Sequence, residues 1–171
     1  MNNLGDLLDW LAASAGTPTD AIAAAKSAAL RDGPDKTDRL FGEAVELREA
    51  IYRICSALAA GRTGAEVDLA ALNRALALAP ARERLAPVDR TYGWAASGFD
   101  LSAPALLAPV LWSAADLLTR ADRSRLRRCA NDRCLWLFID QSKTGTRRWC
   151  DMSSCGNRAK AHRHYLKSKA G

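Results

Sequence analysis

The chain has 171 residues, of which 49% are hydrophobic and 26% are charged, and its net charge is +6; a packed core can form and wholesale disorder is excluded. No apolar run approaches the roughly 18 residues that a membrane-spanning helix needs, and the first residues lack the basic start and apolar stretch of a secretory signal. We therefore expect a cytoplasmic protein without membrane contact, large enough for one ordinary domain and a small second one.

Helical spacing of apolar residues dominates the first 119 residues. The residues with this spacing predict helices over 3–15, 21–30, 37–60, 67–78 and 103–119. Two short segments, 84–88 and 92–96, instead predict a β-hairpin turned by Asp89 and Arg90, which Pro87 restricts to the edge of a sheet. The predicted fold class is therefore mainly α (α+β).

An Arg-rich segment, residues 120–130, marks the predicted boundary between two domains. The first, residues 1–122, is mostly helical, and the second, residues 123–171, holds most of the cysteines. One expectation is that the segment continues the fifth helix into the second domain without a flexible linker.

Five cysteines are present, and four of them form a pattern. Cys55 stands alone in the third predicted helix, where we expect a small buried apolar residue. The other four form two Cys-x4-Cys pairs separated by 15 residues: Cys129, Cys134, Cys150 and Cys155. Two close pairs joined by a hairpin-length spacer are typical of tetrahedral zinc coordination, in which each pair forms a short knuckle of backbone.

Other uses of four thiols are less consistent with this chain. Two disulfides would need an oxidising compartment, a redox pair would be expected as Cys-x-x-Cys, and an iron–sulfur cluster stays open as an alternative. Four thiolates leave no coordination position for water, and no nearby carboxylate stands out as a general base, so we predict one structural zinc ion per chain. Because the module is too small to fold on apolar burial alone, the metal would stabilise it directly.

Between and after the two pairs, the sequence predicts a zinc-ribbon-like or treble-clef-like finger. Its elements are a strand at 135–139, a turn at 140–145, a returning strand at 146–149 and a helix at 157–169. We expect the small core of the finger to be formed by three aromatic residues, Trp136, Phe138 and Trp149. The alternative is that these rings are exposed and stack on nucleic-acid bases. On the helix, His162 shares a face with Cys155 and is expected to pack near the metal or to replace a cysteine ligand, whereas His164 falls on the polar side.

The second domain is strongly basic. Residues 1–119 carry 11 Lys or Arg against 15 Asp or Glu, whereas residues 120–171 carry 14 against 4. Such an asymmetry predicts contact with a polyanion, and a solvated helix face is the alternative. The candidate phosphate contacts, most of which recur at helical spacing, are Arg147, Arg148, Arg158, Lys160, Arg163 and Lys167.

The run Arg-Arg-Trp-Cys-Asp-Met-Ser-Ser-Cys-Gly-Asn-Arg at residues 147–158 resembles the CGNR zinc-finger family of bacteria, and the likeness extends over residues 125–166 with Phe-Ile-Asp at 138–140. A looser resemblance to the family's N-terminal ABATE domain rests on residues 6–11, 47–51 and 72–73. The resemblance implies four zinc-binding cysteines, a basic helix that meets DNA, and a role as a stress-induced transcriptional regulator. Gly156 would then free the backbone after the last ligand, and Asn157 would bond the knuckle or cap the helix.

We therefore predict a DNA-binding transcription regulator with a helical, ABATE-like effector domain that responds to a small molecule; a homodimer is a further expectation. The alternative is a zinc-stabilised module that binds RNA or protein without sequence-specific DNA binding. Residues 1–119 contain no histidine, no Ser/His/Asp set and no phosphate-binding glycine loop, so an enzyme is not expected.

Overall fold

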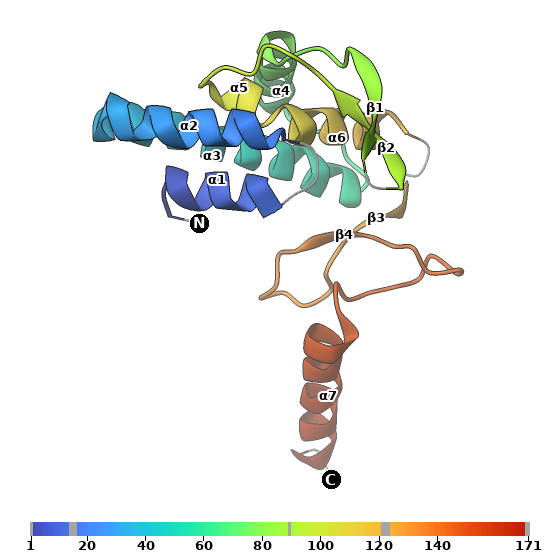
Figure 1. Cartoon of the computed structure of the whole chain (residues 1–171). Coiled ribbons are helices and arrows are strands. Elements are labelled where there is room, and N and C mark those ends of the chain that lie inside the picture. The colour runs from blue at the N-terminus through green and yellow to red at the C-terminus, as the bar shows by residue number, and fades with distance from the viewer. Residues whose placement is uncertain (1, 14–16, 89, 121–123, 170–171) are drawn as a thin grey trace. The chain divides into compact units, whose positions relative to one another are not determined.

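A computed structural model of the chain describes residues 2–13, 17–88, 90–120 and 124–169. The chain forms two compact units: Met1–Ile51 with Glu66–Asp116, and Tyr52–Ala65 with Leu117–Gly171. Most of the described residues are in helices, and the chain also contains two small antiparallel hairpins (Figure 1). The predicted mainly α fold class with a small C-terminal finger is confirmed.

The helices of the first unit surround an apolar core. Their bounds are α1 (Leu4–Ala13), α2 (Thr19–Asp32), α3 (Pro34–Ala59, of which the first unit contains the part up to Ile51), α4 (Glu66–Leu78), α5 (Ala103–Leu106) and α6 (Ala108–Thr119). In α1, four leucines at helical spacing are buried, and α1 lies along α2 (Figure 1). The best-buried large side chains elsewhere in this unit belong to Leu72, Leu106 and Leu111. Because these leucines come from separate segments, the core joins elements that are distant in sequence.

Two helices differ from the sequence prediction. The third begins at Pro34 rather than at residue 37, because proline fits the first turn of a helix, where no N–H is needed. The predicted helix over 103–119 is two helices that meet at Leu107. Pro109 has no N–H for the carbonyl of Ala105, so the first helix ends and the second restarts with the proline in its first turn.

The predicted hairpin is confirmed as β1 (Arg84–Val88) and β2 (Thr91–Ala95), with Leu85 opposite Trp94. Its predicted turn residue Asp89 lies outside the described residues. The guanidinium of Arg82, just before the hairpin, lies 5.5 Å from the ring centre of Trp94 and 5.6 Å from that of Trp112 in α6. It also donates two hydrogen bonds, of 3.0 and 2.8 Å, to the carboxylate of Asp116. This pairing fastens the hairpin to α6.

The second unit contains a hairpin that the sequence prediction placed wrongly. Strand β4 (Leu137–Ile139) pairs with β3 (Leu126–Arg128), which precedes the first cysteine. Residues 146–149 do not form the returning strand. The expectation that residues 120–130 continue the fifth helix is also wrong, since α6 ends at Thr119 and β3 follows. Alternating burial is weak in such short strands, so their partners could not be chosen from the sequence pattern.

The remaining elements of this unit are a single wide helical turn, η2 (Met152–Gly156), and α7 (Asn157–Lys169). Cys55, from the end of α3, is buried as predicted, and burial raises the pKa of its thiol. Among the described residues, every helix is too short or too polar to span a lipid bilayer.

Candidate metal centre

The first knuckle follows directly from β3. The N–H of Cys129 donates to the carbonyl of Trp136 (2.9 Å), and the N–H of Cys134 donates to the carbonyl of Asn131 (2.8 Å), which closes a tight turn between the two cysteines. Leu135 then reverses the chain into β4 with φ 56°, the one positive value of φ at a non-glycine residue in the described part of the chain. A leucine in this conformation carries about 1 kcal/mol or more of backbone strain.

The second knuckle consists of Cys150, η2 and Cys155. The carboxylate of Asp151 accepts hydrogen bonds from the N–H of Ser154 (2.9 Å) and from the hydroxyl of Ser153. These bonds lower the pKa of Asp151 to about 2, with the Ser153 hydroxyl as the largest cause. Because the carboxylate caps this turn, it fixes the direction in which α7 leaves the cysteines.

Two residues of the family motif follow, and the structure assigns a reason to each. The side-chain amide of Asn157 donates to the carbonyl of Ser153 (3.1 Å), which confirms that it bonds the knuckle. Gly156 is not in the left-handed region. A β-carbon there would lie 2.7 Å from the sulfur of Met152, so what glycine provides here is space for the Met152 side chain.

The four predicted ligand sulfurs converge on one point. All four Sγ atoms lie within 4.8 Å of one another. Two of the distances are 3.5 Å, between Cys134 and Cys150, and 3.8 Å, between Cys150 and Cys155. Tetrahedral zinc with bonds of about 2.3 Å requires sulfurs separated by about 3.8 Å, whereas a disulfide needs about 2.05 Å. The set therefore fits zinc, and the prediction of one structural zinc ion held by four cysteines is confirmed.

Two of the thiols resist ionisation, and one ionises more readily than an ordinary cysteine. The pKa of Cys150 is raised to about 12, chiefly by burial and then by the neighbouring cysteines, and the pKa of Cys134 is also raised. Burial opposes ionisation of Cys129 too, but the N–H groups of Cys150 and Asn131 point at its sulfur and bring its pKa down to about 7. A divalent cation removes this conflict, because it neutralises the charge that the thiolates would otherwise share.

A buried carboxylate organises the loop between the knuckles. Asp140 is fully buried, and it accepts hydrogen bonds from the N–H (2.9 Å) and hydroxyl (2.6 Å) of Ser142 and from the N–H of Arg147 (2.8 Å). The pKa of Asp140 is lowered, with the Ser142 hydroxyl as the largest cause and the charge of Arg127 as a smaller one. Asp140 thus brings the two ends of the loop together, as a returning strand was predicted to do.

Arg147 completes this arrangement from the other side. Its guanidinium lies 4.9 Å from the ring centre of Phe138. Its Nε donates to the carbonyl of Trp149 (2.8 Å), and its Nη2 donates to the carbonyl of Cys150. Arg147 was predicted to contact phosphate; its residue is exposed, but these bonds hold its guanidinium against the second knuckle.

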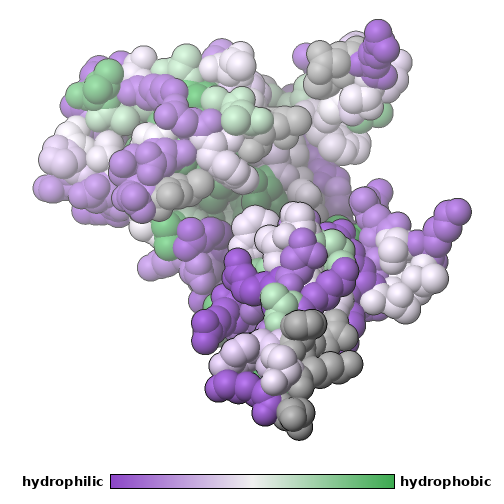
Figure 2. Space-filling model, turned by 90° about the horizontal axis from the view of Figure 1, so that it is seen from below, coloured by the Kyte–Doolittle hydropathy of each residue, from purple (hydrophilic) through white to green (hydrophobic). Residues whose placement is uncertain are grey.

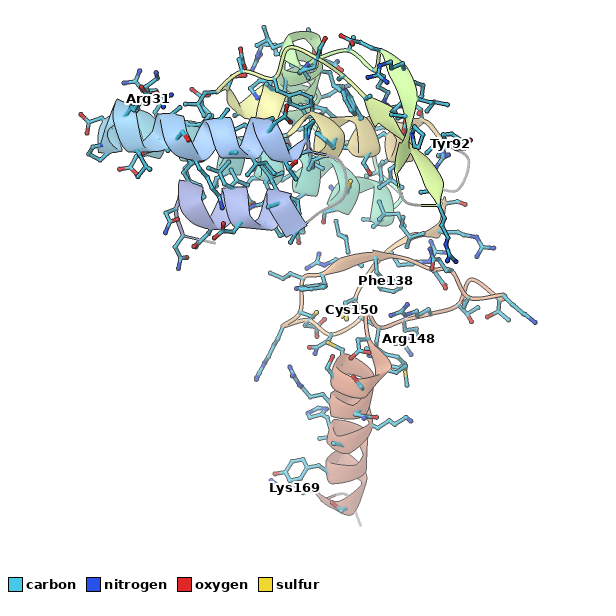
Figure 3. All side chains as sticks on the ribbon, viewed as in Figure 1. Arg31, Tyr92, Phe138, Arg148, Cys150 and Lys169 are labelled. Atoms are coloured by element: carbon cyan, nitrogen blue, oxygen red, sulfur yellow. The ribbon has the colours of Figure 1, made fainter. Side chains whose placement is uncertain are left out.

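The predicted phosphate contacts are exposed where the structure describes them. Like Arg147, the residues Arg148, Arg158 and Lys160 are at the surface. Arg163 and Lys167 lie on α7 by their backbone, and their side chains are outside the described residues. Figure 3 shows Arg148 on the stretch that leads into Cys150, and Figure 2 shows mostly hydrophilic residues on the visible side of the finger.

Two predictions about side-chain packing are wrong, one of them only in part. Of the three aromatic residues expected in the core, Phe138 and Trp149 are half-buried, whereas Trp136 is 69% exposed and is not part of a core. His162 is exposed and does not belong to the cluster of ligand atoms; the side chain of His164 lies outside the described residues. The error at His162 has a plain cause: α7 projects from the finger instead of packing on it (Figure 1), so a shared helical face does not bring its residues to the metal.

Four supporting residues were missed in the sequence. Asn131 directs its side-chain amide at the sulfur of Cys155 (3.5 Å), and the hydroxyl of Tyr52, from the end of α3, donates to the carbonyl of Leu135 (2.9 Å). The other two are Asp140 and Asp151. Three of them, Asn131, Asp140 and Asp151, could have been predicted, because an Asp or Asn two or three residues before a serine or a turn often accepts hydrogen bonds from the following backbone. Tyr52 carries no such signal, because it contacts the knuckle across 83 residues of chain.

Fold and site together define a zinc-finger protein with a helical N-terminal part. The family model of the CGNR zinc finger matches residues 125–168. The model of the ABATE family, described as "Putative stress-induced transcription regulator", matches residues 1–121. The chain therefore belongs to the ABATE family and carries a CGNR zinc finger. A search of curated proteins found no match.

Proposed function

We propose that this regulator binds DNA, and that α7 enters the major groove while the zinc centre fixes its first turn. The observation that carries the proposal is that α7 is both uncovered and uniformly basic. Each of its residues with a described side chain is exposed, apart from the half-buried Ala159. Its 13 residues include no acid and five cations: Arg158, Lys160, Arg163, Lys167 and Lys169.

An uncovered helix of this kind needs an explanation. At 13 residues, α7 is about 20 Å long, and an isolated helix of this length is marginally stable in water. Like charges at helical spacing destabilise it further. A major groove about 12 Å wide accepts a helix and offers phosphates to both of its sides, so DNA would supply the contacts that the chain itself does not.

The cations divide between two roles. Arg147 already donates to two carbonyls of the second knuckle, so we assign it to the fold of the finger. Arg148, Arg158 and Lys160 are exposed and, with Arg163 and Lys167, remain the proposed DNA contacts. Their summed charge would give affinity that falls steeply with salt.

The test is a charge reversal with a matched control. The triple variant Lys160→Glu, Arg163→Glu, Lys167→Glu should lower affinity for duplex DNA by about 100-fold or more and reduce the salt dependence of binding by about three phosphate contacts. The control reverses three exposed arginines of the first unit, Arg31, Arg39 and Arg74, with the same change in charge. Fluorescence anisotropy at two salt concentrations measures the DNA affinity of both variants and its salt dependence, and metal analysis checks that zinc is retained. Equal losses in the two variants would contradict the proposal.

One observation favours a second candidate, binding of single-stranded RNA. Trp136 is 69% exposed on a backbone that the first knuckle holds rigidly, and exposed aromatic rings stack on unpaired bases. Titrating duplex DNA against single-stranded RNA separates the two: Trp136→Ala should weaken only RNA binding, by about tenfold. Preference for RNA in the unmodified protein would replace the first proposal by the second.

The N-terminal unit has its own proposed role. We propose that it receives a small-molecule signal and takes no part in catalysis; the support is that its family is described as a stress-induced transcription regulator, which needs a part that responds to a signal. A homodimer remains a prediction, which the molecular mass in solution at several protein concentrations would test.

A further inference from the structure

Arg147 and Arg148 are neighbours in sequence, yet their side chains are used differently. The guanidinium of Arg147 is bound within the finger, whereas that of Arg148 has no hydrogen bond or ion pair within the described part of the chain. Arg148 instead lies over the ring of Trp149, with its guanidinium carbon 5.2 Å from the ring centre. Its donors are therefore free while its position is restrained.

The backbone of Arg148 is restrained as well. Its carbonyl accepts a hydrogen bond from the N–H of Ala130 (2.8 Å), beside the first ligand Cys129. Two residues later, Cys150 belongs to the ligand set. Arg148 is thus connected on both sides to the zinc centre, and Figure 3 shows it on this stretch of chain.

We propose that Arg148 recognises guanine in the DNA bound by the finger, by donating two hydrogen bonds to O6 and N7 in the major groove. This inference rests on the proposed function. The planar fork of a guanidinium matches these two acceptors. Stacking on Trp149 holds the fork in place before binding, so less side-chain freedom is lost when the base is contacted. The lysine ammonium groups of α7, on flexible stems, are suited to phosphates.

The experiment begins with the full chain and a selection of bound sequences from random duplexes. The best duplex is then compared with copies in which one guanine at a time is replaced by 7-deazaguanine, which lacks the N7 acceptor. For the unmodified protein, replacement at one position should raise the dissociation constant about 5- to 150-fold, which is the discrimination that a good bidentate contact to a base provides.

Arg148→Lys keeps the charge and loses the fork. It should bind all duplexes with similar affinity and show less than a twofold response to 7-deazaguanine at the critical position. Trp149→Leu, which removes the stacking partner, should weaken the response in the same direction, and metal analysis checks that both variants hold zinc. The matched control is Arg74→Lys, at an exposed position of the first unit outside the proposed DNA contacts, which should leave the response unchanged.

The outcomes separate this inference from the proposed function. If the unmodified protein binds duplexes but Arg148→Lys keeps the full response, or if the loss is the same for every duplex, Arg148 contacts phosphate and the guanine assignment is overturned. If the unmodified protein binds no duplex, the proposed function fails, and the guanine assignment fails with it.

Discussion

In the first unit, many leucines and alanines of α1, α4, α5 and α6 are buried, and Leu111 is completely buried. In the second unit, the buried apolar residues among those described are few, and two of them, Cys129 and Cys155, are metal ligands. The first unit is therefore stabilised mainly by removal of apolar surface from water, and the second by a metal ion and hydrogen bonds. The two units should respond independently to different perturbations.

Loss of zinc should have the largest effect, and only on the second unit. Structural zinc contributes about 10–16 kcal/mol of binding free energy in small fingers at neutral pH, more than a finger this size gains from its core. A chelator, or Cys150→Ser, should therefore unfold the finger and leave the first unit folded. Hydrogen exchange would follow both units separately. Protection retained by α7 and the knuckles without metal would contradict the assigned source of stability.

The reciprocal change is Leu111→Ala. Truncating a completely buried leucine should lower the unfolding free energy of the first unit by about 2–5 kcal/mol, because a cavity remains where the side chain was. Zinc affinity should stay within twofold of its original value. Thermal unfolding monitored together with zinc release would show whether only the unfolding temperature of the first unit changes. Simultaneous loss of zinc would mean that the two units unfold as one.

Zinc binding should depend steeply on pH. The raised pKa values of Cys134 and Cys150 mean that both thiols hold protons at pH 7, and zinc must displace them. Lowering the pH from 7 to 6 should therefore weaken zinc binding by about 100-fold or more, since each displaced proton contributes tenfold per pH unit. Calorimetry in buffers of different ionisation enthalpy counts the protons released. Release of fewer than two per zinc would show that these thiols are already ionised.

The smallest effect is expected at Leu135. Its φ of 56° favours glycine, so Leu135→Gly should be more stable than Leu135→Ala by about 1 kcal/mol. The opposite order is expected at Ala24, an exposed residue in the interior of α2, where Ala24→Gly should cost about 1 kcal/mol. Zinc competition and thermal unfolding measure the two sites. If alanine is more stable than glycine at both sites, the backbone strain assigned to Leu135 in the first knuckle is contradicted.

The sequence by itself determined the helices and the metal ligands, for a local reason. Apolar residues at helical spacing and two Cys-x4-Cys pairs are patterns within short stretches of chain, so α1 to α4, the first hairpin and the four cysteines were predicted, with element bounds shifted by a few residues. Proline at 109 divided one predicted helix, an effect that is also local and could have been foreseen.

Only the tertiary structure decided how the finger is completed. The partner of β4 is β3 rather than residues 146–149, Asp140 takes the role expected of a strand, and Tyr52 reaches the first knuckle from α3. The exposure of Trp136 and His162 was decided in the same way, because burial depends on which segments pack together. Short strands and single hydrogen bonds between distant residues leave no periodic signal in the sequence, and this is why they appear only in the folded chain.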